Sequence, residues 1–171
     1  MSEAPACSVR ALDATDLPAF RVMRLDALRL HPRAYGSSYE EESEYTLDDF
    51  AARWPTPPGV MLGAFADERL IGFTGLQVPQ KIKQRHKGII YTVYVDAAFR
   101  RRGVADGLMT AAIAAARTAR LRYVWLTVAA DNENARRLYD RLGFRRFGTE
   151  LRGLLVDGLF VDEDMMVLDL D

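Results

Sequence analysis

The junction between an apolar run and an alanine-rich run constrains this chain most. Residues 89–95 are apolar and residues 103–119 are alanine-rich, so the pattern predicts a strand followed directly by a helix. Residues 99–108, between and across them, read FRRRGVADGL. The first N–H groups of a helix lack intrahelical partners and carry partial positive charge, and Gly103 and Ala105 leave the backbone open to close approach. The segment therefore predicts a binding site for a phosphate or pyrophosphate.

Length and composition indicate one globular domain. The chain has 171 residues, of which 49% are apolar and 27% charged, so we expect a single domain over residues 1–171. The net charge of -1 argues against general binding to nucleic acid. Cys7 is the one cysteine, which excludes an internal disulfide and a cysteine-based zinc cluster. A single thiol is also compatible with a reducing compartment.

The sequence predicts neither a membrane span nor a leader. No apolar run approaches the ~18 residues that a spanning helix needs. Residues 1–6 are small and polar, without the basic start or apolar stretch of a signal peptide. We therefore expect a cytoplasmic protein that does not bind a membrane.

Predicted strands and helices alternate along the rest of the chain. Strands are expected at 9–12, 60–66, 70–77, 88–95, 123–128, 145–151 and 159–170, and helices at 16–30, 46–54, 103–119 and 132–142. Residues 33–45 and 153–158 are interpreted as loops. Antiparallel strands thus precede a strand–helix–strand crossover, which predicts an α/β (α+β) fold with a mixed, mostly antiparallel central sheet of about seven strands flanked by about four helices.

A second motif joins the first. Residues 95–105 read VDAAFRRRGVA, and residues 131–144 read DNENARRLYDRLGF. Together they resemble the GNAT (Gcn5-related N-acetyltransferase) superfamily, whose acetyl-CoA motif is Arg/Gln-x-x-Gly-x-Gly/Ala and whose later motif is Asn-x-x-Ala-x-x-Leu-Tyr-x-x-x-Gly-Phe. The predicted order of elements is similar to that fold over nearly the whole chain. Two positions depart from the family pattern, because Ala97 stands where proline is frequent and Arg101 where glycine is common.

The resemblance implies acetyl-CoA as co-substrate and no metal. Backbone N–H groups of residues 101–106 would hold the pyrophosphate, and the backbone at the end of the preceding strand would pair with pantetheine. Asn132 would contact the cofactor or fix its loop, and Tyr139 would be the general acid to the leaving thiolate. The implied cofactor-binding residues are Tyr94, Val95, Arg100, Arg101, Arg102, Gly103, Val104, Ala105, Asp106, Asn132 and Tyr139.

The resemblance also implies direct acyl transfer. A neutral amine attacks the thioester carbonyl, whose oxygen would accept a hydrogen bond from the Val95 N–H. Relatives often use a glutamate on the third or fourth strand as base, but residues 88–95 carry no carboxylate. The candidates are the glutamates of the first long loop or an ordered water. Those glutamates are Glu40, Glu41, Glu42 and Glu44.

Several residues have structural interpretations beside these functional ones. Tyr139 also fits a core aromatic, Asn132 also fits a helix cap, and residues 100–102 also fit a solvated basic run. Carboxylates at residues 40–44 would favour a cationic acceptor if they line a cleft, but they equally fit a solvated loop. The tyrosines near this segment would wall a substrate pocket or simply pack. These are Tyr35, Tyr39 and Tyr45.

The sequence as a whole favours a GNAT N-acetyltransferase that acts on a primary amine of a small molecule. A protein N-terminus or lysine is the alternative acceptor. Alternatives from other classes are a non-catalytic acyl-CoA-binding sensor and another nucleotide-binding αβ protein. The absence of a Gly-x-x-x-x-Gly-Lys-Ser/Thr motif argues against the nucleotide-binding protein. The resemblance also allows a homodimer, for which the sequence shows no interface.

Overall fold

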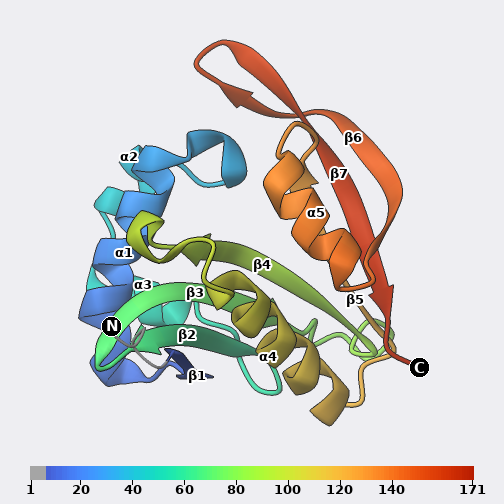
Figure 1. The fold of residues 1–171 in the computed structure, drawn as a ribbon, viewed down its shortest axis with the longest axis horizontal. Coiled ribbons are helices and arrows are strands. Elements are labelled where there is room, and N and C mark those ends of the chain that lie inside the picture. The colour runs from blue at the N-terminus through green and yellow to red at the C-terminus, as the bar shows by residue number, and fades with distance from the viewer. Residues whose placement is uncertain (1–6) are drawn as a thin grey trace, which may run out of the picture.

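A seven-stranded mixed sheet forms the centre of the structure, a computed structural model that describes residues 7–171 (Figure 1). Residues 1–6, on which the expectation of no leader rests, lie outside the described part. Within residues 7–171, no helix has the length and apolar character that crossing a bilayer requires. The strands are β1 (Cys7–Ala11), β2 (Val60–Ala66), β3 (Arg69–Gln77), β4 (Lys87–Val95), β5 (Tyr123–Ala129), β6 (Arg145–Val156) and β7 (Leu159–Asp169).

Five α-helices and three short 3-10 turns complete the described residues. The helices are α1 (Leu17–Leu30), α2 (Tyr39–Ser43), α3 (Leu47–Ala52), α4 (Val104–Thr118) and α5 (Glu133–Arg141), and the 3-10 turns are η1 (Ala14–Asp16), η2 (Pro32–Ala34) and η3 (Ala97–Phe99). The strand order is β1-β2-β3-β4-β5-β7-β6, in which β4 and β5 are parallel and every other neighbouring pair is antiparallel. The prediction of a mixed, mostly antiparallel sheet is confirmed.

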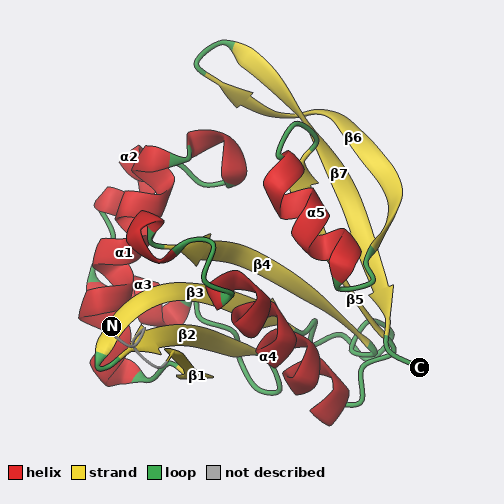
Figure 2. Cartoon of the chain, in the orientation of Figure 1, coloured by secondary structure: helices red, strands yellow, loops and turns green. Residues whose placement is uncertain are grey.

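The helices divide between the two faces of the sheet (Figure 2). On one face α4 buries Val104, Leu108 and Ala112, which recur every four residues and so form one stripe, in a core that α5 shares. On the other face α1 and α3 pack over β2 and β3, where the ring of Phe20 lies 5.0 Å from that of Phe73. On this second face, the helices cover only part of the sheet.

A gap opens in the sheet between β4 and β5. The two strands pair only where Lys87–Ile89 meets Tyr123–Trp125. Further along β4, Thr92 has a φ of 55° and the register with β3 shifts, which is a β-bulge. The bulge bends β4 away from β5, so the two parallel strands separate beyond their short ladder.

The structure corrects two of the predicted loops. Residues 33–45 contain η2 and the helix α2, whose Ser38 and Glu41 form a capping box. The second correction concerns residues 153–158, because β6 runs through to Val156 with a register shift after Glu150. Only Asp157 and Gly158 turn the chain, both with positive φ, as a two-residue hairpin requires.

Candidate cofactor and acceptor site

The turn before α4 has the geometry of an anion site. Gly103 precedes the helix with a φ of 76° and a ψ of 4°, and a Cβ built on it would meet no atom within 4 Å. As the residue before the helix, Gly103 offers no side chain to the free N–H groups of the first turn. These groups face a cavity of about 410 Å³, the α4 cavity, which is lined by Val95, Phe99, Arg100, Arg101, Gly103, Val104, Ala105, Asp106, Asn134, Leu138 and Arg141.

The three consecutive arginines have different surroundings. Arg100 and Arg101 line the α4 cavity, whereas the guanidinium of Arg102 lies 5.5 Å from the centre of the Phe99 ring. Arg101 has a φ of 60°, a conformation that glycine adopts with less strain. The departure from the family pattern at Arg101, where glycine is common, therefore places a side chain on a strained backbone.

Arg100 also joins the turn to the end of α1, a contact that sequence reasoning missed. Its Nε donates to the Val95 carbonyl at 3.1 Å, and its Nη2 lies 2.8 Å from Nε2 of His31. Because arginine only donates, Nε2 of His31 accepts, and the ring proton sits on Nδ1. Burial, with the charge of Arg100, lowers the pKa of His31, so the ring is neutral at pH 7.

Peptide groups of β4 point into the gap between β4 and β5. Tyr94 pairs with Phe73 of β3, and the Asp96 N–H donates to Ile71, so these residues face β3. The carbonyls of Val93 and Val95 accept instead from Tyr35 and Arg100. Because the N–H and C=O of one strand residue point to the same side, we infer that the N–H groups of Val93 and Val95 face the gap. The sequence assigned this role to Tyr94 and Val95, and it missed Val93.

Tyr139 lies at the gap, on the inner face of α5. It is 6% exposed and lines two cavities of about 390 and 80 Å³, which we call the gap cavity and the inner cavity. Burial raises the pKa of Tyr139 to about 12, so the phenol keeps its proton at neutral pH. Asn132 lines both cavities, and its Oδ1 accepts from the Ala135 N–H at 3.2 Å, which confirms that it caps α5.

The cavities form a continuous route from α4 to the gap. The α4 cavity and the gap cavity share five lining residues, which are Val95, Arg100, Ala105, Asn134 and Leu138. The gap cavity and the inner cavity in turn share six lining residues, among them Tyr35, Asn132 and Tyr139. A long, thin ligand can therefore extend from the first turn of α4 to Tyr139.

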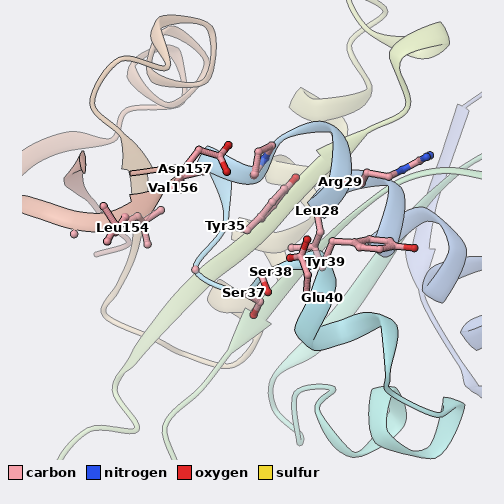
Figure 3. Close-up of a pocket in the computed structure, with 14 residues that line it drawn as sticks. Leu28, Arg29, Tyr35, Ser37, Ser38, Tyr39, Glu40, Leu154, Val156 and Asp157 are labelled. Atoms are coloured by element: carbon pink, nitrogen blue, oxygen red, sulfur yellow. The ribbon is translucent and has the colours of Figure 1, made fainter. Parts of the chain in front are cut away.

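A fourth cavity lies between the α1–α2 segment and the end of β6, and it holds about 520 Å³. In Figure 3 Tyr35 stands between two groups of its lining residues. One group contains Leu28, Tyr39 and Glu40, and the other contains Leu154, Val156 and Asp157. We call this the hairpin cavity. Because Tyr35 also lines the gap and inner cavities, the hairpin cavity meets the route from α4 at this ring.

Three of the glutamates proposed as base have defined surroundings. Glu42 is 7% exposed and accepts from Arg24 at 2.9 and 2.6 Å, so its carboxylate is held in a buried ion pair. Glu41 caps α2 through the N–H of Ser38, and Glu40 lines the hairpin cavity. Arg24 also donates to the hydroxyl of Thr92 at 2.7 Å, which ties α1 to the bulge in β4.

The sequence predicts that the tyrosines near residues 40–44 either wall a substrate pocket or simply pack, and the structure shows both arrangements. Burial raises the pKa of Tyr35, whose hydroxyl donates to Val93 at 3.3 Å, and Tyr39 lines the hairpin cavity. Tyr45 packs instead against Phe50 and beneath the guanidinium of Arg53. Two of the three tyrosines therefore wall a pocket.

Comparison with known proteins places the chain in a family. The sequence profile described as the Acetyltransferase (GNAT) family matches residues 24–144. This range includes the α4 turn and Tyr139, and it covers more than half of the chain. The chain belongs to the GNAT acetyltransferase family, and the resemblance noted in its motifs is confirmed.

Several relatives of the chain are named mycothiol acetyltransferases. The protein of that name from Rhodococcus jostii (strain RHA1) is 34% identical over 134 residues, which cover 74% of this chain and 43% of that protein. The one from Thermomonospora curvata is 32% identical over 158 residues, which cover 88% of this chain and 51% of that protein. The chain thus spans about half the length of the curated relatives it matches.

Solved structures share the fold. A GCN5-related N-acetyltransferase from Kribbella flavida has a TM-score of 0.83 at 24% identity, with 96% of this chain and 98% of that chain covered. A protein from Salmonella typhimurium, solved with its cofactor acetyl-CoA, has a TM-score of 0.80 at 21% identity, with 97% of this chain and 95% of that chain covered. At these identities the likeness confirms the GNAT fold.

Proposed function

We propose that this chain is an acetyl-CoA-dependent N-acetyltransferase that moves an acetyl group to a primary amine of a small molecule by direct attack. The observation that carries the proposal is the position of Tyr139, which faces the gap in the sheet at the far end of the route from the α4 turn. A phenol that stays protonated at neutral pH is suited to act as a general acid at that point.

The residues along the route fit the parts of acetyl-CoA. The free N–H groups at residues 101–106 and the guanidinium groups of Arg100 and Arg101 suit the pyrophosphate. Pantetheine carries amides, which suit the gap-facing peptide groups of Val93 and Val95. When bound, the cofactor supplies the acetyl group as a thioester.

Two groups of this chain would act on the reacting atoms. The Val95 N–H faces the gap and would donate to the carbonyl oxygen, where negative charge develops during transfer. Tyr139 would donate its proton to the leaving sulfur. Tyr35 walls the junction between the cofactor route and the hairpin cavity and would hold the acceptor in line with the acetyl carbon.

The hairpin cavity is the proposed acceptor site. It holds about 520 Å³, and Glu40 and Asp157 on its wall favour a cationic amine, although Arg29 also lines it. The mycothiol acetyltransferases among the relatives are named for a small-molecule substrate, which supports this class. We also propose that the protein is cytoplasmic and that it acts without nucleic acid. The net charge of -1 supports the second of these proposals.

The cofactor site is tested by titrating acetyl-CoA into the protein in a calorimeter. The Gly103→Glu variant should lose binding, because a carboxylate would enter the anion site. Gly158→Glu is the matched control, since Gly158 also has a φ of 76° and open space at its Cβ but lies in the β6–β7 turn. Micromolar binding to Gly103→Glu would show that the turn is not the cofactor site.

Transfer itself is tested with four amines, namely spermidine, lysine, kanamycin and an alanine-terminated peptide, with release of free CoA as the readout. We expect release with at least one small amine. Release with the peptide alone would favour a protein acceptor. Binding of acetyl-CoA without release from any of the four would favour the non-catalytic sensor and overturn the proposed activity.

A further inference from the structure

Glu163 on β7 lies next to Gly153 and Thr127, residues that line the hairpin cavity and the inner cavity respectively. A Cβ built on Gly153, which lines the hairpin cavity, would stand 2.9 Å from Oε2 of Glu163. Thr127, which lines the inner cavity, is a diagonal neighbour of Glu163 across β5 and β7. Its hydroxyl is close enough to lower the pKa of the Glu163 carboxyl group. The carboxylate therefore lies beside the walls of both cavities, close to the junction at which the acceptor and the acetyl group would meet.

Glu163 points to the face of the sheet opposite α5. The next residue, Asp164, is 1% exposed and lies 3.5 Å from Arg136 of α5, so it faces that helix. Successive strand residues point to opposite faces, which directs Glu163 to the side on which α1 and α2 lie. The acceptor would arrive from this side, whereas the cofactor route starts at α4 on the other.

The surroundings of Glu163 favour a carboxylate that takes up protons readily. Its partner across the β6–β7 ladder is Glu150, so two like charges stand directly opposite each other, an arrangement that destabilises a sheet. Burial raises the pKa of Glu163, the charge of Glu150 raises it further, and the Thr127 hydroxyl lowers it. Glu150 from β6 is the charged group that acts on it, and β5 contributes only the neutral Thr127.

We propose that Glu163 is the general base of acetyl transfer, an assignment that rests on the proposed function. Its carboxylate takes one proton from the acceptor ammonium, and the freed nitrogen then bonds to the acetyl carbon. The carbon–sulfur bond breaks, sulfur takes the phenolic proton of Tyr139, and the second nitrogen proton passes to solvent, from which Tyr139 is reprotonated. Glu150 would hold Glu163 in a more basic state and add to the attraction for a cation.

The first test needs no acceptor. The carboxyl group of Glu163, identified by its loss in Glu163→Gln, is titrated by 13C NMR in the free protein. It should titrate above the ordinary glutamate pKa, and Glu150→Gln should bring it down. Glu68→Gln, in the turn after β2, is the matched control and should leave the titration unchanged. An ordinary pKa that does not respond to Glu150→Gln would contradict the electrostatic part of the proposal.

The second test follows kcat against pH with whichever of spermidine, lysine, kanamycin or the alanine-terminated peptide the wild type acetylates. Loss of a general base should lower kcat by roughly 10²–10⁴-fold in Glu163→Gln. The decline in rate at acid pH should vanish in that variant and move to lower pH in Glu150→Gln. Wild-type transfer that Glu163→Gln leaves unchanged would overturn the base assignment alone, whereas no transfer by the wild type would overturn the proposed function.

Discussion

Removing one partner of the Arg24–Glu42 pair should destabilise the protein severely. Both side chains are nearly buried, at 10% and 9% exposure, and the two hydrogen bonds between them measure 2.9 and 2.6 Å. Arg24→Met would leave the Glu42 carboxylate buried without its partner, which costs about 3–5 kcal/mol. In a chain of this size that loss corresponds to a fall in Tm of roughly 6–20 °C. The shift is measured by thermal denaturation at pH 7.

Two further variants separate this explanation from a general loss of packing. The double variant Arg24→Met/Glu42→Leu removes both charges and should recover most of the stability. Arg29→Met removes an exposed partner of Asp26 from the same helix, with side-chain exposures of 62% and 45%, and should cost at most about 1 kcal/mol. If Arg24→Met costs no more than Arg29→Met, burial of the Arg24–Glu42 pair does not make the loss of one partner costly.

The remaining predictions concern the turn, the acid and the base. Arg101→Gly should raise the free energy of unfolding by up to about 1 kcal/mol, because it relieves a positive φ, and an unchanged or lower Tm would contradict this. Tyr139→Phe should lower kcat by roughly 10²–10⁴-fold with little change in the Kd for acetyl-CoA, whereas an unchanged kcat would remove Tyr139 as the acid. Glu163→Gln should raise Tm at pH 7. A raised pKa means that the folded state binds protons more tightly, so ionised Glu163 destabilises the protein at neutral pH. The gain should disappear as pH falls below the ordinary pKa of the carboxyl group, and a gain that is independent of pH would refute this origin.

The sequence could predict the parts of the fold and site that depend on local pattern. The strand, turn and helix around Gly103 follow from residues that lie side by side in the chain, and so does the cap at Asn132. The short helix α2 was also within reach, because Ser38 and Glu41 have the spacing of a capping box. The extended β6 was harder to predict, since Gly153 suggests a turn where the structure has an irregular strand.

Contacts between distant segments could not be read from the sequence. Arg100 meets His31 across 69 positions, and Arg24 meets Thr92 across 68. Each contact joins α1 or its end to β4 or the turn after it, and no local pattern determines how these segments pack. Glu163 escaped notice for the same reason, because its closeness to Thr127 exists only once β7 pairs between β5 and β6.

The short ladder between β4 and β5 divides the sheet into two units, and we call the boundary between these strands the seam. Strands β1–β4 form one unit, strands β5–β7 form the other, and only residues 87–89 and 123–125 pair across the seam. Peptide groups that face the open part of the seam have no ladder to protect them from solvent hydrogen exchange. A ligand lying along Val93 and Val95 would serve as a bridging strand. Occupancy of the site would therefore couple the two units mechanically, and the amides of β4 would report it by slower exchange.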